Sequence, residues 1–588
     1  MTNACIRFAE AHIDYDWPTV PATLSLLIVR TGNRHEYQKV SYKKRIVLAT
    51  MIEAELSENK GRFIDPLING IWSICEESWW GAAAHLPRGK EYSGLMDVTN
   101  PFVDLYAGVT AGILAWADYF LGEKFDEVSP QIRKRIRHEI DCRILTPLRT
   151  KHHGWMGTEE GDGTPNNWNP WICSNWLTAV LLIDNDDTRR AQTVAQILKT
   201  LDAFMNHYPE DGGCSEGPGY WGGAFGALYD NILLLNLATD NAFDYVYENE
   251  KFRNMARFIY RVQISENYAV NFADAPPWMA GVTNFGYRIG KSIQDENMMR
   301  LAAYYRSSAF SPDFVRSHFT RDFCDLFMQD EIRKAPQGLV LPQDVWLPDL
   351  EVAVARDKGG SSNGFFFAAK GGNNAESHNH NDIGNFIVYY DGRPLLIDIG
   401  SPRYTAMTFT DRRYEIWNLC SDYHNTPTIN GVTQKAGKDF HASDTRFRKK
   451  DTSSEFSLDI AGAYPEDAAV KSWKRTITLN RGKNLLIRDV SDLRKAESVT
   501  LHLMTCYPAE VTGKGEVTVF YKDAEGKEQP FLLKFNSNQF SAEVEKIKLE
   551  TLSDEGVRDS WGDNIRRINL KAITPKTKDT YLVEIKKK

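Results

Sequence analysis

The stretch that decides the fold is GFFFAAKGGNNAESHNHNDIGNFIVYYDGRPLLIDIG, residues 364–400. Three short apolar runs within it, at residues 364–369, 386–390 and 395–399, end at glycine, lysine or aspartate. Such runs, rich in aromatic and branched residues and separated by turn residues, predict β-strands. The densest polar cluster of the chain, Glu376 to Asp382, lies between the first two runs.

The rest of the chain beyond this stretch continues the strand pattern. Short apolar segments recur between turn residues at 455–460, 475–479, 484–487, 498–504, 516–521, 530–535 and 580–585. Strands at this spacing are typical of stacked antiparallel sheets. We therefore expect residues 341–588 to form a β-sandwich region.

The chain before residue 335 has a different periodicity. Apolar residues recur at helical spacing over residues 41–56, 103–120, 193–206 and 292–307. Gly-, Pro- and Asn-rich loops lie between such segments, at residues 154–165, 211–218 and 274–277. We expect paired helices in a bundle, solenoid or toroid.

Helices first and strands second predict a multidomain α+β protein and exclude an alternating α/β fold. Residues 334–350 contain three prolines and are expected to form a linker. The predicted domains are a helical domain over residues 1–340 and the β-sandwich region over residues 341–588.

Bulk properties limit the partners of the chain. It has 588 residues and a formal net charge of -8, which argues against a nucleic-acid-binding protein. The charge does not exclude an anionic ligand, because a local cluster of Arg and Lys could bind one. No apolar run approaches the roughly 20 residues of a membrane span. The eight cysteines are scattered without a CxxC pair, so we expect free thiols and neither a disulfide framework nor a cysteine zinc site. The sequence does not predict the oligomeric state.

Histidines and acidic residues in the strand region offer metal ligands. His380, Asp398 and His424 would suit zinc as two imidazoles and a carboxylate, although a hydrogen-bonded network without an ion explains the same residues. In an extended segment, His378 and His380 point to the same face, so one could bind a metal while the other faces a cleft.

Two loops of the helical region carry further candidates. The glycine-rich loop DGGCSEGPGYW, residues 211–221, could present the Tyr220 hydroxyl to a ligand, or Tyr220 could pack on Trp221. The loop NNWN, Asn166 to Asn169, is typical of a turn, but its amides could also bind a carboxylate. Ten of the 15 tryptophans lie at or before Trp221, which fits either a carbohydrate cleft or a large helical core.

Taken together, these segments resemble the heparinase II/III-like polysaccharide lyases. The matching motifs are NNWN at 166–169, DGGCSEGPGY at 211–220, HNHNDIGNF at 378–386, PLLIDIG at 394–400 and HNT at 424–426. The resemblance covers roughly residues 70 to 435. It implies an incomplete (α/α) toroid followed by antiparallel sheet layers, and a bacterial enzyme exported to the periplasm or secreted after loss of a signal peptide.

The resemblance also implies roles for individual residues. Tyr220 and His378 match the catalytic tyrosine and histidine of the family, and Asn167 or its neighbour Asn166 matches the residue that contacts the substrate carboxylate. His380, Asp398 and His424 match structural zinc ligands of some members. The remaining candidates for contact with substrate are Glu216, Arg413, Trp168 and Trp221, and for Glu216 and Arg413 a structural role explains the residue equally well. No organic cofactor is implied.

The implied reaction is β-elimination on a uronic-acid glycosaminoglycan, such as hyaluronan, chondroitin, heparin or heparan sulfate. Amide donors would offset the uronate charge, a base would remove the C5 proton, and an acid would protonate the leaving O4. Where C5–H and O4 lie on the same face of the sugar ring, Tyr220 could act as both base and acid. Where they lie on opposite faces, His378 would be the base and Tyr220 the acid. A tyrosine base needs a lowered pKa, which cationic neighbours could supply.

Other functions remain open at this point. The same mechanism could act on alginate or another polyuronate. A glycoside hydrolase would use two carboxylic acids, for which Asp211 and Glu216 are available. A glycan-binding protein without catalysis would show binding and no turnover.

Overall fold

The structure is a computed structural model that describes residues 2–87, 92–279, 282, 284–306 and 318–588. The chain groups into two compact units that alternate along the sequence. The first unit comprises Met1–Tyr208, Gly222–Asn249 and Val282–Gln337, and the second comprises Pro209–Trp221, Glu250–Gly281 and Gly338–Lys588.

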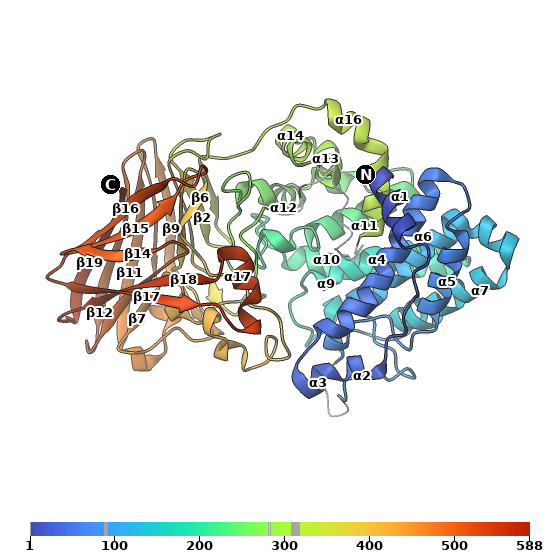
Figure 1. Cartoon of the computed structure of the whole chain (residues 1–588), viewed down its shortest axis with the longest axis horizontal. Coiled ribbons are helices and arrows are strands. Elements are labelled where there is room, and N and C mark those ends of the chain that lie inside the picture. The colour runs from blue at the N-terminus through green and yellow to red at the C-terminus, as the bar shows by residue number, and fades with distance from the viewer. Residues whose placement is uncertain (1, 88–91, 280–281, 283, 307–317) are drawn as a thin grey trace. The chain divides into compact units, whose positions relative to one another are not determined.

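The first unit is built of helices. Its longest are α4 (His35–Glu58), α6 (Leu105–Val128), α9 (Trp168–Ile183), α10 (Asp187–His207) and α11 (Phe225–Ala238). The shorter ones are α1 (Thr2–Ala11), α2 (Ala22–Ser25), α3 (Leu27–Thr31), α5 (Ile64–Cys75), α7 (Gln131–Ile140), α8 (Thr146–Thr150), α13 (Asn284–Ser292), α14 (Glu296–Tyr305), α15 (Phe319–Asp325) and α16 (Gln329–Lys334) (Figure 1).

Helix α6 lies at the centre of this unit and packs against α9. Its start is capped by Asp104, whose side chain accepts a hydrogen bond from the Ala107 N–H. At Gly112 a Cβ atom would lie 2.4 Å from Oδ1 of Asn175 on α9. Glycine at this position therefore allows the two helices to approach closely.

The predicted helices are confirmed, with longer bounds in three cases. Residues 41–56, 103–120 and 193–206 lie mainly in α4, α6 and α10. The helix expected at 292–307 begins later than predicted, because α13 ends at Ser292 and α14 begins at Glu296, where the Asp295 side chain caps it. Residue 307 lies outside the described residues.

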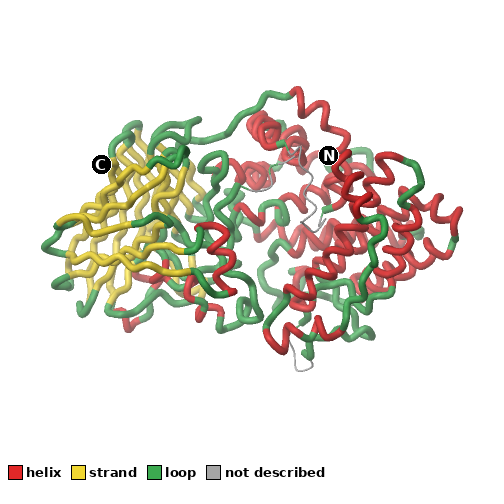
Figure 2. The backbone as a smooth tube through the Cα atoms, viewed as in Figure 1, coloured by secondary structure: helices red, strands yellow, loops and turns green. Residues whose placement is uncertain are grey.

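The second unit contains the β-sheets (Figure 2). All their strand pairs are antiparallel. One sheet has the order β1-β2-β3-β5-β6, with β1 (Asp344–Leu347), β2 (Val352–Arg356), β3 (Phe365–Lys370), β5 (Phe386–Tyr390) and β6 (Arg393–Leu396). The largest has the order β14-β15-β16-β19-β12-β11-β10-β9, with β9 (Ser443–Lys450), β10 (Ser453–Asp459), β11 (Val470–Asn480), β12 (Asn484–Leu493), β14 (Ala509–Gly513), β15 (Glu516–Lys522), β16 (Glu528–Phe535) and β19 (Lys578–Lys587).

Two smaller sheets complete this unit. One has the order β17-β18-β13-β7, with β7 (Pro427–Ile429), β13 (Val499–Thr505), β17 (Phe540–Lys548) and β18 (Asn564–Ala572), and the other pairs β4 (Asn373–Asn374) with β8 (Gly437–His441). The unit also includes helices α12 (Glu250–Arg261) and α17 (Glu555–Trp561). Buried residues such as Phe367, Ile477 and Ile568 belong to three different sheets and share one core, so the sheets stack face to face.

The expected strands are confirmed, and two local expectations are wrong. The run at 395–399 does not form a strand to its end: β6 stops at Leu396, so Asp398 lies on the loop that follows. Residues 334–350 are not a plain linker, because they contain strand β1. The division into domains at residues 340 and 341 stays a prediction.

No helix among the described residues is long and apolar enough to cross a membrane. All eight cysteines are free thiols, as expected.

Candidate functional site

The glycine-rich loop ends in Tyr220, which lies in the short 3₁₀ helix Pro218–Tyr220 of the second unit. Gly212 and Gly217 have φ angles of 76° and 87°, which favour glycine. At Gly217 a Cβ atom would lie 2.5 Å from the Cβ of Ala275. The loop therefore needs this glycine to pack against the segment that carries Asp274.

His378 lies in a loop and not in the extended segment expected from the sequence. Its φ angle is 56°, a left-handed conformation that residues with a side chain rarely adopt. The expectation that His378 and His380 share one face of a strand is therefore wrong. A conformation of this kind is maintained only where the surrounding contacts enforce it, and it is common at functional sites.

Three aromatic side chains meet at the end of the glycine-rich loop. The Tyr220 hydroxyl lies 2.6 Å from the Tyr404 hydroxyl and 3.4 Å from Nδ1 of His378. The Tyr404 hydroxyl lies 3.0 Å from the same Nδ1. All three side chains are partly exposed, and Phe409 packs edge-on against His378 and Tyr404. Hydroxyl and imidazole groups able to exchange protons thus reach the surface of this unit together.

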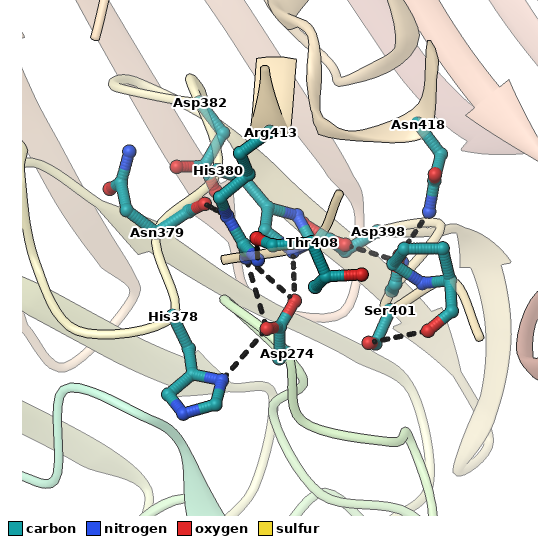
Figure 3. Close-up of polar contacts among 12 residues, drawn as sticks. Asp274, His378, Asn379, His380, Asp382, Asp398, Ser401, Thr408, Arg413 and Asn418 are labelled. Carbon is teal, nitrogen blue, oxygen red and sulfur yellow. Dashed lines mark hydrogen bonds and ion pairs between the residues drawn. The ribbon is translucent and has the colours of Figure 1, made fainter. Parts of the chain in front are cut away.

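The carboxylate of Asp274 is buried and lies 2.8 Å from Nδ1 of His378 (Figure 3). It accepts hydrogen bonds from the Tyr404 hydroxyl and from the Arg413 guanidinium, each at 3.0 Å. Its pKa lies well below the usual range: burial opposes ionisation, but hydrogen bonds from His378 and His380 and the charge of Arg413 outweigh it. Asp274 is therefore a fixed negative charge.

The electrostatics of Tyr220 differ from what the sequence suggested. Burial and then the charge of Asp274 raise the pKa of Tyr220 well above its usual range, while the hydrogen bond with Tyr404 and the charge of Arg413 oppose this only in part. The sequence suggested that cationic neighbours would lower the pKa of Tyr220, but the net shift is upward. Tyr220 is consequently a protonated phenol at neutral pH.

His380, Asp398 and His424 come together as a cluster that could hold a metal ion. All three are fully buried, and one ligand atom from each lies within 4.8 Å of the others. Nδ1 of His380 and Nε2 of His424 are buried without a hydrogen-bond partner in the described part of the chain. Because buried polar atoms are normally paired, two such nitrogens beside a carboxylate fit a divalent metal such as zinc.

Around these three residues, further side chains fix their orientation. Nε2 of His380 lies 2.9 Å from Oδ1 of Asp274, and the Asn385 amide donates to Asp398 at 2.6 Å. His424 Nδ1 lies 3.2 Å from Oδ2 of Asp398. Hydrogen bonds to the second nitrogen of a histidine are typical of metal sites.

Asn166, Asn167 and Trp168 belong to the helical unit, at the start of α9. Asn166 accepts a hydrogen bond from the Trp168 N–H, and Asn167 is buried at the N-cap position. The Trp168 ring is partly exposed and lies 4.8 Å from the ring of His85.

A set of partly exposed residues that sequence reasoning missed surrounds Trp168. Nδ1 of His85 lies 2.8 Å from Oδ2 of the buried Asp104, and the His85 ring stacks on Tyr106. Arg34 bonds to the other nitrogen of His85 at 3.2 Å. Aromatic faces beside a guanidinium suit an anionic sugar, so this surface of the helical unit could bind one.

Three other residues that were predicted to contact substrate are buried: Trp221, Arg413 and Glu216. Trp221 is fully buried and its indole donates to the Met255 carbonyl, so it belongs to the core. The Arg413 guanidinium is buried against Asp274 and two carbonyl groups. Glu216 is buried and accepts a hydrogen bond from Ser377, which joins the glycine-rich loop to the histidine loop.

Sequence reasoning assigned no role to Asp274 or Tyr404. Asp274 appeared only as the first residue of the loop at 274–277, and Tyr404 was not singled out. The sole local signal was the rigid Ala-Pro-Pro sequence at 275–277 after an aspartate.

The fold and this site define an α+β protein with a tyrosine–histidine cluster and a candidate metal centre. Residues 342–561 match the family described as Heparinase II/III-like, C-terminal. Over these residues, the chain is similar to the C-terminal domain of heparinase II/III-like proteins.

Solved structures extend the likeness over the whole chain. The crystal structure of heparinase III has a TM-score of 0.65 at 14% identity, covering 97% of this chain and 79% of that chain. A mutant of the heparan sulfate lyase HepC from Pedobacter heparinus has a TM-score of 0.60 at 12% identity, covering 99% and 83%. At these identities the likeness establishes the shared fold. No curated protein matches the chain in sequence.

Proposed function

We propose that this protein is a polysaccharide lyase that cleaves a uronic-acid glycosaminoglycan by β-elimination. The proposal rests on one observation: Tyr220 is within hydrogen-bond reach of both Tyr404 and His378. Tyr404 and His378 in turn contact the buried Asp274 carboxylate. Elimination needs one group that accepts a proton and one that donates a proton, and the cluster contains both kinds.

The reaction breaks two bonds and forms one double bond. A base takes the C5 proton, the electrons of that bond form the C4=C5 double bond, and the C4–O4 bond breaks. The departing O4 takes a proton from an acid. The product is a 4,5-unsaturated uronate and a new chain end.

Tyr220 can be the acid because it is protonated at neutral pH, and burial and the charge of Asp274 favour this form by raising its pKa. His378 is suited to be the base when C5–H lies on the opposite face, since its Nε2 has no hydrogen-bond partner among the described residues. Where C5–H and O4 share a face, Tyr220 would act twice: its hydroxyl would first lose its proton to solvent, the phenolate would take the C5 proton, and the same proton would then pass to O4. This second course needs substrate binding to lower the pKa of Tyr220.

The helical unit would supply binding and charge compensation. We assign Asn167, with Asn166 beside it, to the substrate carboxylate, and Trp168 to stacking on a sugar ring. The position of His85 and Arg34 next to Trp168 supports this, because a cation and an aromatic face there suit an anionic sugar.

A zinc ion would have a structural role. His380, Asp398 and His424 would hold it, and it would stabilise the fold of the histidine loop. We further propose that the protein acts in the periplasm or outside a bacterial cell.

The names of the similar structures, heparinase III and heparan sulfate lyase, support a glycosaminoglycan as substrate. The hydrolase alternative has weaker support. Both carboxylate oxygens of Asp211 accept hydrogen bonds from backbone N–H groups, of Gly213 on one side and of Asp349 and Leu350 on the other. Asp211 is thus a structural residue and a poor partner for Glu216.

The test is a substrate panel of hyaluronan, chondroitin sulfate, heparan sulfate and alginate. A lyase produces an ultraviolet absorbance from the C4=C5 double bond together with new reducing ends. New reducing ends without this absorbance would indicate a hydrolase and overturn the proposal. Binding without either signal would indicate a glycan-binding protein.

A further inference from the structure

A single carboxylate, that of Asp274, contacts both the candidate catalytic histidine and a candidate metal ligand (Figure 3). Its Oδ2 lies 2.8 Å from Nδ1 of His378. Its Oδ1 lies 2.9 Å from Nε2 of His380. The Arg413 guanidinium lies 3.0 Å from both oxygens. Asp274 therefore joins two histidines that lie in one loop but use different ring nitrogens.

The contacts decide which nitrogen of each ring carries a proton. A carboxylate paired with a guanidinium accepts hydrogen bonds and does not donate them. His378 must therefore hold its proton on Nδ1, and His380 must hold its proton on Nε2. In the neutral form of each ring, the nitrogen without a proton is then Nε2 of His378 and Nδ1 of His380.

Each unprotonated nitrogen lies where the proposed function needs a lone pair. Figure 3 shows the second ring nitrogen of His378 on the side of the ring away from Asp274. Nδ1 of His380 is buried beside Asp398 and His424, without another partner in the described chain. The same carboxylate thus prepares one histidine to take a proton and the other to bind a metal.

We propose that Asp274 is a positioning residue that fixes the tautomer and ring orientation of His378 and His380 together, and so links the metal site to the catalytic site. This inference rests on the proposed function for its catalytic part. The left-handed backbone at His378 supports it, because the contact with Asp274 helps to hold that conformation. Metal binding at His380 and proton transfer at His378 would then depend on one side chain.

The decisive variant is Asp274→Asn, which keeps the shape but replaces one acceptor by a donor. The amide can serve as acceptor for only one of the two histidines, so the other must change its tautomer. By analogy with other histidines that lose an orienting aspartate, we expect kcat to fall on the order of 10³- to 10⁴-fold. KM should change by less than about threefold, because Asp274 is buried and out of reach of a substrate.

The matched control is Asp459→Asn. Asp459 is also a buried carboxylate of the second unit, but it accepts from Ser472 and from the Trp473 and Ala461 N–H groups. This variant should lower the melting temperature and leave kcat per folded molecule unchanged. A merely structural Asp274 would behave in the same way as Asp459.

A second measurement does not depend on activity. Nitrogen-15 NMR of histidine-labelled wild-type protein, assigned with the His378→Gln and His380→Gln variants, reports the protonated nitrogen of each ring. We expect Nδ1–H at His378 and Nε2–H at His380, and a change at one of them in Asp274→Asn. Elemental analysis should show a lower metal content in that variant.

Two results would overturn the proposal: a wild-type His378 protonated on Nε2 alone, or Asp274→Asn protein with kcat within threefold of wild type. If Asp274→Asn does not fold, the wild-type spectrum still decides. If wild type cleaves no substrate of the panel, the proposed function fails, while the tautomers and the metal content still test Asp274.

Discussion

Replacing Tyr220 by phenylalanine removes one hydroxyl group from the centre of the site. The hydroxyl makes a 2.6 Å hydrogen bond with Tyr404 and a longer contact with His378. Tyr404 keeps its hydrogen bond to Asp274 and no cavity forms, so the free energy of unfolding should fall by only about 0.5–1.5 kcal/mol. The loss of the proton donor should lower kcat on the order of 10²- to 10⁴-fold or more.

The assay is the initial rate of ultraviolet absorbance at saturating substrate, divided by the folded fraction from a melting curve. Substrate binding by calorimetry should remain within about threefold of wild type, because Phe keeps the ring. Tyr464→Phe is the matched control: the Tyr464 hydroxyl is also buried, but it donates to the Pro427 carbonyl. That variant should lose about 1 kcal/mol of stability and keep its rate.

The opposite pattern would refute the reasoning. If Tyr220→Phe turns over at the wild-type rate, the hydroxyl is not the acid, and Tyr404 becomes the first candidate. If Tyr220→Phe loses binding to the same degree as kcat, Tyr220 is a contact residue and transfers no proton.

Three further predictions concern the metal, the pH and the sugar contact. His424→Ala should abolish metal content by elemental analysis and lower the melting temperature, whereas the exposed His441→Ala should do neither. Burial lowers the pKa of His502 to about 4 in the folded protein, whereas the same histidine in the unfolded chain has a pKa of about 6.5. Between these two pH values, the unfolded chain therefore binds more protons than the folded protein. The contribution of His502 to the free energy of unfolding should therefore be fully present above about pH 6.5 and be lost as the pH falls to about 4. Denaturant titrations should show a loss of at most about 3 kcal/mol, and a smaller loss in His502→Gln. Trp168→Ala should raise KM roughly two- to tenfold in rate assays, because aromatic packing contributes about 0.5–1.5 kcal/mol. Trp72→Ala removes an exposed indole of α5 in the same unit and should leave KM unchanged.

Each of these has a clear contrary result. Unchanged metal content in His424→Ala would remove it from the ligand set. An equal pH dependence of stability in His502→Gln would assign that dependence to other groups. A wild-type KM in Trp168→Ala would mean that the indole does not contact the sugar.

Local patterns were sufficient for the secondary structure and for much of the residue set. Strand β5 begins and ends where the apolar run at 386–390 predicted, because a short apolar run between turn residues depends on near neighbours alone. The cluster of His380, Asp398 and His424 was also predicted, because three metal-ligand residue types in one part of the chain are a visible signal.

Other features depend on segments that only the folded chain brings together. Asp274 lies 104 residues from His378 in sequence, and no local pattern links them. The raised pKa of Tyr220 follows from burial and from the charge of Asp274, neither of which a linear sequence displays. The burial of Trp221 and the left-handed backbone of His378 likewise come from packing.

The sequence by itself determined the order of helices and sheets, the family motifs and the types of residue available for proton transfer and metal binding. Periodicity and composition are properties of adjacent residues, so they can be read without coordinates. Only the tertiary structure decided which nitrogen of each histidine is free, which carboxylate orients it and which aromatic rings reach the surface. These depend on distances between side chains from distant segments, and hydrogen bonds vary steeply over a few tenths of an ångström.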